Sequence, residues 1–201
     1  VWMAMFASAG SAPVRSYSRR SAGKPGENVD NGGDMGPPVF LGLGSNLGDR
    51  EAAIERALAR LGDRGFRVKV RSSLWLTEPV GGPPQGWFLN AVAGGETPLP
   101  PEALLEACLA TEREMGRVRA ERNGPRTIDV DILFFGEERR DTPGLALPHP
   151  GLHERRFVLA PLAEIAPGLV HPVLGLTVAE LLARCPDASA VRRHFSAEAP
   201  A

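Results

Sequence analysis

The run of residues 127–135, Thr-Ile-Asp-Val-Asp-Ile-Leu-Phe-Phe, constrains the fold of this chain more than any other stretch. β-branched and aromatic residues dominate it, which is typical of a strand. Because side chains alternate between the two faces of a strand, Asp129 and Asp131 are expected on one face and the intervening apolar residues on the other. Two carboxylates on one face of an apolar strand repel each other and resist burial. The stretch therefore predicts a strand whose polar face meets either solvent or a cation.

Arginines crowd the residues just before these aspartates, and we interpret the whole stretch as a site for a metal ion and a polyanion. A divalent cation would relieve the repulsion between the carboxylates, and hard oxygen ligands suit Mg²⁺. A guanidinium group matches the oxygens of a phosphate. The combination indicates a nucleoside triphosphate bound with Mg²⁺, and the alternative is a solvated edge strand after a charged loop. The arginines are Arg117, Arg119, Arg122 and Arg126.

Length and charge favour one domain of ordinary size, because the chain has 201 residues and a formal net charge of −1. The balanced charge gives no general reason to expect binding to nucleic acid or to a membrane surface. No apolar run approaches the roughly 18 residues that span a bilayer. Cys108 and Cys185 are isolated and fall on the apolar faces of expected helices, so we predict buried free thiols and a reducing compartment.

The first 37 residues differ in composition from the rest of the chain. They are rich in Ser, Gly, Arg and Pro and hold no acidic residue before Glu27. We expect a disordered extension over residues 1–37, with an organelle transit peptide as the alternative. The predicted domain then occupies residues 38–195, and residues 196–201 form a short tail.

The hydrophobic pattern of the domain predicts elements in the order β-α-β-β-α-β, followed by helical additions at the C-terminus. This is the order of a ferredoxin-like α+β fold, in which an antiparallel sheet has two helices packed on one face. The loop from Glu78 to Gly86, rich in Gly and Pro, is a candidate functional loop. A helix is expected over residues 150–165, and Thr177 with Glu180 forms a capping box for a last helix. The core strands are expected at 39–43, 66–75, 87–93 and 127–135, with helices after Asp49 and Pro100.

The stretch 116–136, GRVRAERNGPRTIDVDILFFG, resembles the signature of the 6-hydroxymethyl-7,8-dihydropterin pyrophosphokinase family of folate biosynthesis. The resemblance extends over about residues 39–185. It implies an enzyme that moves a diphosphate group from ATP to the hydroxymethyl oxygen of the pterin and releases AMP, with two Mg²⁺ ions taking part. Further pieces similar to the family's motifs occur in the family's order: Gly42-Leu43-Gly44-Ser45-Asn46-Leu47-Gly48, Thr77-Glu78-Pro79-Val80-Gly81, Phe88-Leu89-Asn90-Ala91 and Leu147-Pro148-His149-Pro150.

Roles for individual residues on the phosphate side follow from the same resemblance. Asp129 and Asp131 would hold the two Mg²⁺ ions. The catalytic arginines would be Arg117, Arg119, Arg122 and Arg126. The residues that bind ATP would be Glu112, Arg119, Arg126, His149 and Arg155.

On the pterin side, the resemblance implies that Phe88 and Phe157 sandwich the ring and that Asn90 reads its edge. Thr77 and Val80 would contact the pterin from the loop. The spacing gives independent support, because Phe88 and Asn90 are two apart on one strand and so share a face.

Three positions depart from the family pattern. Leu109 stands where some relatives have a nucleotide-contacting glutamine, and Asn123 and Pro150 stand where aromatic residues are common. These departures bear on the adenine contacts and on the closure of the arginine loop, which we define as residues 118–125. They do not bear on the metal positions, which match the family.

Two other functions stay open at this point. An RNA-binding module would need exposed aromatic residues on the sheet in a motif that this sequence lacks. A different Mg²⁺-dependent nucleotidyl or phosphoryl transferase is harder to exclude, because only the pterin positions discriminate. We expect ATP and the pterin as small-molecule partners, no nucleic acid or membrane, and a monomer in the cytoplasm.

Overall fold

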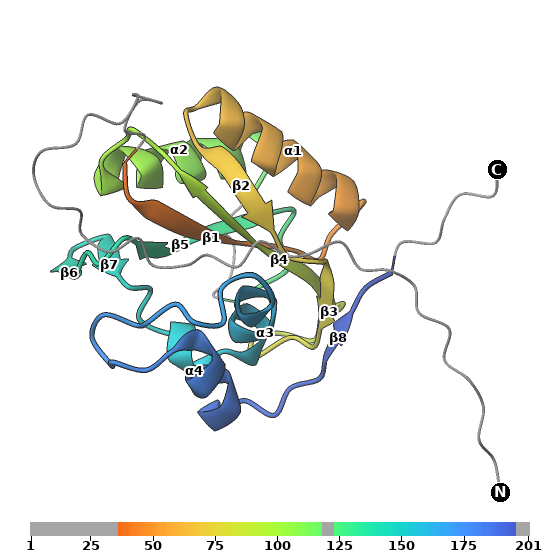
Figure 1. Cartoon of the computed structure of the whole chain (residues 1–201). Helices are drawn as coiled ribbons and strands as arrows, with labels where there is room; N and C mark the ends of the chain where they lie inside the picture. The colour runs from red at the N-terminus through yellow and green to blue at the C-terminus, as the bar shows by residue number, and fades with distance from the viewer. Residues whose placement is uncertain (1–35, 118–122, 196–201) are drawn as a thin grey trace, which may run out of the picture.

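A computed structural model describes residues 36–117 and 123–195 of the chain (Figure 1). An antiparallel sheet of six strands forms its centre, in the order β5-β1-β4-β3-β8, with β2 also paired to β4. A separate hairpin joins β6 to β7. The strands are β1 (Pro38–Ser45), β2 (Arg67–Arg71), β3 (Trp75–Thr77), β4 (Phe88–Glu96), β5 (Asp129–Phe135), β6 (Arg140–Thr142), β7 (Leu145–Leu147) and β8 (Val191–Arg193).

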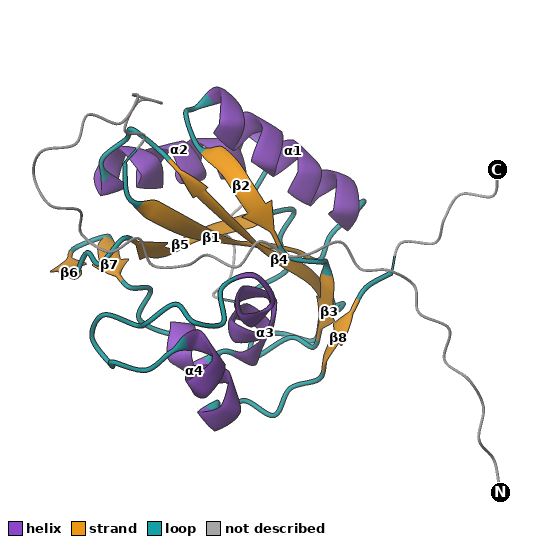
Figure 2. Ribbon diagram, in the orientation of Figure 1, coloured by secondary structure: helices purple, strands orange, loops and turns teal. Residues whose placement is uncertain are grey.

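Helices cover both faces of the sheet (Figure 2). Helices α1 (Arg50–Asp63) and α2 (Pro101–Glu114) lie on one face, and α3 (Arg156–Ile165) and α4 (Val178–Arg184) lie on the other, after a short 3₁₀ helix over Leu152–Glu154. Local sequence sets where they begin. The Asp49 carboxylate accepts from the amide of Ala52 at 3.0 Å, and Thr177 with Glu180 forms the predicted capping box.

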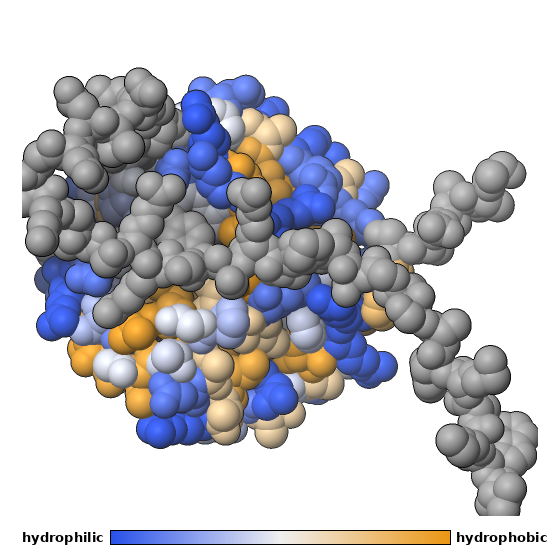
Figure 3. Space-filling view, in the orientation of Figure 1, coloured by the Kyte–Doolittle hydropathy of each residue, from blue (hydrophilic) through white to orange (hydrophobic). Residues whose placement is uncertain are grey.

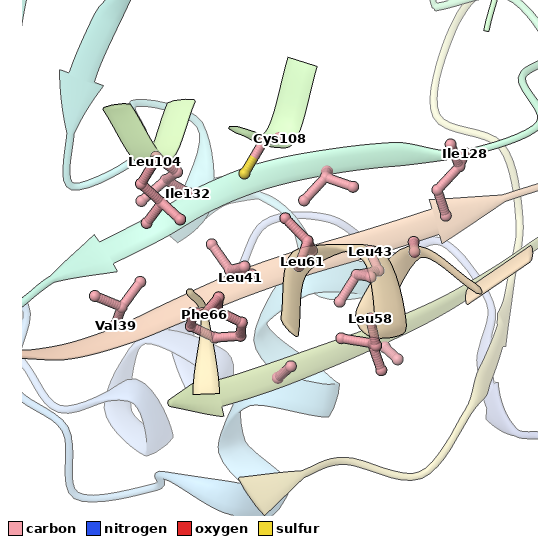
Figure 4. Packing of buried hydrophobic residues seen from close by; sticks show 14 of the residues in the cluster. Val39, Leu41, Leu43, Leu58, Leu61, Phe66, Leu104, Cys108, Ile128 and Ile132 are labelled. Atoms are coloured by element: carbon pink, nitrogen blue, oxygen red, sulfur yellow. The ribbon is translucent and has the colours of Figure 1, made fainter. Parts of the chain in front are cut away.

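Two hydrophobic cores result, one on each face. The first packs residues such as Leu41, Leu61 and Leu104 between the sheet and helices α1 and α2 (Figure 4). The second packs Phe134 and Leu159 with other apolar residues between the sheet and helices α3 and α4. Because both faces are covered, alternate residues of β5 meet different environments. Val130 and Ile132 pack in the first core, whereas Leu133 packs in the second.

The outer surface is mixed in character. On the face seen in Figure 3, hydrophobic residues gather over the α3–α4 half of the molecule. The connection between these two helices exposes Val170, Val173 and Leu174. Among the described residues, no helix is both long and apolar enough to cross a bilayer.

The ferredoxin-like α+β fold is confirmed, but four local predictions were wrong or incomplete. The strand expected over 66–75 is two strands, β2 and β3, interrupted at residues 72–74, where the hydroxyl of Ser72 accepts from the amide of Val92 at 2.9 Å. A register shift between Val68 and Val70 lies within β2, and Val68 is exposed. The helix expected from residue 150 begins at Arg156, because Arg155 has an extended backbone. Cys108 is buried as predicted, whereas Cys185 is half-buried just after α4 ends. The hairpin β6–β7 and strand β8 were missed because three residues are too few to show a period.

The predicted extension and tail fall mostly on residues 1–35 and 196–201, which lie outside the described part of the chain. Strand β1 begins at Pro38, where the domain was expected to start. The boundaries of the domain, 38 and 195, stay a prediction.

Candidate functional site

A cavity of about 890 Å³ opens between the sheet and helix α3 and extends around the edge strand β5 to helix α2. Residues 129, 131 and 133 of β5 line it, which places it on the face of the sheet that α3 covers. The predicted site residues that line this one cavity are Thr77, Val80, Phe88, Asn90, Glu112, Arg117, Arg126, Asp129, Asp131, His149, Arg155 and Phe157. The other two predicted residues, Arg119 and Arg122, lie outside the described residues.

The floor of the cavity is the central strand β1, at two positions without side chains. Gly44 is paired with Asn90 of β4 on one side and with Asp129 of β5 on the other. A Cβ atom added at Gly44 would lie 2.4 Å from Oδ1 of Asn90, and one at Gly42 would lie 3.3 Å from the side chain of Leu133. Glycine at these two positions therefore leaves space for the side chains of Asn90 on β4 and Leu133 on β5.

Asp129 is held by two arginines. Its carboxylate accepts hydrogen bonds from Arg117 and from Arg126. Arg117 also pairs with the buried carboxylate of Glu112, which accepts from the amide of Val130 at 2.8 Å. Burial would lower the pKa of Arg117, but the two carboxylates outweigh that effect and raise it. The arginine is fully charged, and the cluster has a fixed geometry.

Asp131 meets a different environment from Asp129. Burial raises the pKa of Asp131 to about 7, with a further contribution from the negative charge of Asp129, while Arg155 and Arg117 act in the opposite direction. The two aspartates that the sequence treats alike thus differ. One is neutralised by arginines, and the other is the carboxyl group that most needs a cation for its ionised form.

The donor set fits Mg²⁺. Asp129 and Asp131 both face the cavity, and a nearby divalent cation would favour the ionised form of Asp131. Over residues 36–117 and 123–195 there is no cluster of three or more His, Cys, Asp or Glu side chains that could hold a metal. Mg²⁺ does not require one, because proteins commonly bind it through one or two carboxylates together with the phosphates of a substrate.

His149 and Arg155 occupy the same wall, on the segment that leads from β7 into α3. Nδ1 of His149 accepts from the amide of Gly151 at 3.2 Å, and its own amide donates to the carbonyl of Leu133 at 3.0 Å. Burial and the positive charge of Arg155 lower the pKa of His149 to about 4. The imidazole is therefore neutral near pH 7 and can accept or donate a hydrogen bond without bringing charge.

The other end of the cavity combines aromatic faces with a buried amide. Asn90 donates from Nδ2 to the hydroxyl of Thr77 at 2.7 Å, and both residues are buried. The Phe88 ring centroid lies 5.2 Å from the guanidinium carbon of Arg126. Phe157, at the start of α3, lies 5.9 Å from the guanidinium of Arg155 in the same way. Val80 is about half exposed on its loop, at 47%.

Sequence reasoning missed the role of Asn46. Its Oδ1 accepts from the amide of Arg126 at 2.7 Å, and its Nδ2 donates to Oε1 of Gln85 at 2.9 Å. Nε2 of Gln85 in turn donates to the carbonyl of Asn123 at 2.7 Å. Asn46 thus ties three segments together at the rim of the cavity. Its place in the quoted motif of residues 42–48 was the signal that could have identified it.

The departure at Asn123 has a structural reason. Asn123 has a positive φ of 57°, a conformation that Asn adopts more readily than most residues with a side chain. Its carbonyl also lies close to Gly82, where an added Cβ atom would be 2.5 Å away. An asparagine therefore suits the contact between the arginine loop and the loop of Val80.

Comparison with known proteins gives the family. The family model of 7,8-dihydro-6-hydroxymethylpterin-pyrophosphokinase matches residues 40–167. A 2-amino-4-hydroxy-6-hydroxymethyldihydropteridine pyrophosphokinase of Methylorubrum extorquens is 47% identical over 156 residues, which are 77% of this chain and 97% of the relative. One of the same name from Pseudomonas aeruginosa is 46% identical over 151 residues, which are 74% of this chain and 91% of the relative.

Longer proteins contain the same unit. The folic acid synthesis protein fol1 of Pneumocystis carinii is 39% identical over 92% of this chain, which is 25% of that protein. A solved structure described as HPPK-DHPS in complex with substrates has a TM-score of 0.60 at 13% identity, over 73% of this chain and 43% of that chain. At that identity the likeness supports the fold alone. The chain matches the family model, and it matches two relatives over more than nine tenths of their length. It therefore belongs to the 7,8-dihydro-6-hydroxymethylpterin-pyrophosphokinase family.

Proposed function

We propose that the cavity is where this pyrophosphokinase transfers diphosphate from ATP to 6-hydroxymethyl-7,8-dihydropterin, in the synthesis of folate. One observation supports this more than any other. The carboxylate–arginine cluster around Asp129 and the aromatic–amide end around Asn90 meet on either side of Gly44, in one cavity. The reaction needs this juxtaposition, because the pterin hydroxyl must reach the β-phosphorus of ATP.

The reaction forms a bond between the hydroxymethyl oxygen and the β-phosphorus, and breaks the bond from that phosphorus to the oxygen of the α-phosphate. AMP leaves, and the hydroxyl proton is lost. Such a transfer depends on positioning and on neutralising charge more than on covalent help from the protein. Arg117 and Arg126 are fixed by Asp129 and would hold the phosphates without reorganising. Arg119 and Arg122 are proposed to join them.

Nucleotide binding is proposed for the wall of Glu112, His149 and Arg155. Glu112 would act through Arg117, which it holds, so that the guanidinium stays aimed into the cavity. His149 is neutral and Arg155 is charged, which suits a sugar–phosphate chain that offers both hydroxyl groups and anionic oxygens.

Two Mg²⁺ ions are proposed at Asp129 and Asp131. When bound with ATP, they would neutralise the charge on the transferred group and on the departing AMP. The protein's part is to present the two carboxylates on one face of β5, with Asp131 buried enough to favour a cation beside it.

The pterin is proposed to lie between Phe88 and Phe157, with its edge against Asn90. Thr77 would hold the amide of Asn90 in place through the hydrogen bond that joins them. Val80 would contact the ring from the loop. An aromatic sandwich with one buried amide suits a flat heterocycle that has donors and acceptors along its edge.

A single assay tests the proposal. The protein is incubated with ATP, Mg²⁺ and 6-hydroxymethyl-7,8-dihydropterin, and the nucleotide product is identified. AMP is expected. ADP would instead indicate an ordinary kinase, and neither product would indicate a binding protein.

We also propose that the chain works as a monomer in the cytoplasm, with residues 38–195 as its single domain. The buried free thiol of Cys108 and the enclosure of the cavity by one chain support this. Light scattering after size-exclusion chromatography would test the monomer, and a dimer mass would contradict it.

A further inference from the structure

The C-terminal strap, which we define as residues 187–195 and which includes strand β8, runs along the outer side of the pterin end of the cavity. It lies beyond the residues 40–167 that the family model matches. Strand β8 lies at the edge of the sheet, where it pairs with Trp75, Leu76 and Thr77 of β3. Figure 1 shows β8 beside β3, at the end of the chain.

The strap is hydrogen-bonded to the start of the loop that follows β3. The amide of Glu78 donates to the carbonyl of Ala190 at 3.0 Å, and the amide of Ala190 donates to Oε2 of Glu78 at 3.2 Å. Glu78 comes directly after Thr77, the residue that holds Asn90. The strap therefore fixes the point at which the loop leaves the sheet.

The strap also contacts the end of the same loop, just before β4. The guanidinium carbon of Arg192 lies 4.9 Å from the ring centroid of Trp87. Trp87 comes directly before Phe88, and its carbonyl accepts from Arg50 at 2.9 Å. The strap thus contacts both ends of the loop that contains Val80.

A third contact reaches the opposite wall. Oδ2 of Asp187 accepts from the amide of Arg156 at 3.0 Å, at the start of α3. The next residue of that helix is Phe157, the second aromatic face of the cavity. Away from the cavity, the strap is held through its backbone, because β8 pairs with β3 and the amide of His194 donates to the carbonyl of Leu74 at 2.8 Å.

We propose that the C-terminal strap positions the pterin-binding end of the cavity, with Arg192 as the positioning residue through Trp87. It sets the spacing between the face of Phe88 and the face of Phe157, and so the affinity for the pterin. Arg117 and Arg126, which are proposed to hold the phosphates, are fixed by Asp129 and not by the strap. The inference rests on the proposed assignment of this end to the pterin.

The experiment compares two adjacent arginines of β8 that point to opposite sides. Arg192→Ala removes the contact with Trp87, and Arg193→Ala removes the same charge and the pair with Glu164 but leaves the loop alone. Steady-state AMP formation gives the turnover and the KM values for pterin and for ATP. Arg192→Lys tests rescue, because an ammonium also binds an aromatic face.

For Arg192→Ala the KM for pterin should rise about twofold to fivefold, the size of a cation–π contact made by an exposed arginine. Its KM for ATP and its turnover at saturation should stay at the wild-type values, and Arg192→Lys should recover most of the loss. Arg193→Ala should keep the wild-type KM for pterin. A Trp87→Leu variant should show the same rise, and combining it with Arg192→Ala should add little further, because both remove one contact.

Two results would overturn the inference. One is an unchanged pterin KM in both Arg192→Ala and Trp87→Leu, and the other is an equal rise in the KM values for pterin and ATP. If Arg192→Ala melts below the assay temperature, Trp87→Leu decides the question, because it leaves every residue of the strap in place. A wild-type protein that forms no AMP would instead refute the proposed function, and the strap assignment with it.

Discussion

Asn90 and Asp129 are partners of the same residue, since each pairs with Gly44 from its own side of strand β1. The amide proposed to read the pterin and the carboxylate proposed to hold a metal ion are therefore two strands apart on one row of the sheet. Their separation is set by backbone hydrogen bonding and does not depend on any flexible side chain. The relationship makes Gly44 a sensitive position.

Replacing Gly44 by alanine should impair pterin binding selectively. The new methyl group would lie 2.4 Å from Oδ1 of Asn90, so the amide must move and its bond to Thr77 is disturbed. We expect the KM for pterin to rise about tenfold, as for a lost buried hydrogen bond. Gly62→Ala is the matched control, because nothing lies within 4 Å of a Cβ atom there. A Gly44→Ala variant with wild-type pterin KM would contradict the proposed role of Asn90.

Changing Asp129 or Asp131 to asparagine should reduce turnover in either case but shift stability in opposite directions. Turnover in saturating Mg²⁺ should fall by at least about 10²-fold, as when one preorganised electrostatic partner is lost. Asp129→Asn should destabilise the fold by about 2 kcal/mol, since Arg117 and Arg126 lose their shared carboxylate. Asp131→Asn should stabilise the metal-free protein above pH 7, because burial raises the pKa of this carboxyl group and so disfavours its ionised form in the folded protein.

Melting temperatures of both variants, with a chelator and without nucleotide, would check this prediction. The sequence alone predicts one outcome for both variants, namely a relief of repulsion. Equal stabilisation of the two variants would mean that the arginine pairs of Asp129 contribute nothing. Wild-type turnover in both variants would remove the proposed metal site.

Acid should destabilise the protein partly through His149. Its folded-state pKa of about 4 lies below the ordinary 6.5, because burial and Arg155 disfavour the charged form. The unfolded chain therefore binds more protons between these values, so the contribution to stability is complete above pH 6.5 and is lost as the pH falls toward 4. Melting curves at about pH 7.5 and about pH 5 should show a smaller loss for His149→Gln than for wild type. Equal losses would indicate that the imidazole is charged in the folded protein.

The two thiols should differ in reactivity. Burial raises the pKa of Cys108 to about 12, with Glu112 and Asp131 adding to the effect, so almost no thiolate exists near neutral pH. Cys185 is half-buried just beyond the end of α4. Iodoacetamide on the native protein should modify Cys185 well before Cys108, as read by peptide mass spectrometry. Labelling of Cys108 at the rate of the unfolded chain would show that α2 opens readily.

Periodicity identified the elements that are long and have one buried face. Strand β5 is the clearest case, because Val130 and Ile132 pack in the first core and Asp129 and Asp131 line the cavity. Short elements escaped, since β3 and β8 have three residues each and are stabilised by neighbours distant in sequence. A bulge such as that at Val68 depends on the partner strand and leaves no local trace.

For the site, the motifs predicted which residues meet but not how they are paired. Asp129 and Asp131 have the same side chain and the same face, yet only the fold brings Arg117 and Arg126 to one of them. Asn46 shows the same limit, because its three partners lie on segments between 39 and 80 positions away. Such contacts depend on tertiary structure, so the local pattern of a single sequence does not predict them.

The second core and the cavity are built from some of the same residues, since Val92, Leu133 and Val158 belong to both. A ligand in the cavity would therefore pack directly against the core. Larger side chains at these positions would fill the space and raise heat resistance while excluding the ligand. At these positions, selection for thermal stability and selection for catalysis thus act against each other. Substitutions that stabilise the protein without loss of activity should instead be found in the core on the α1–α2 side of the sheet.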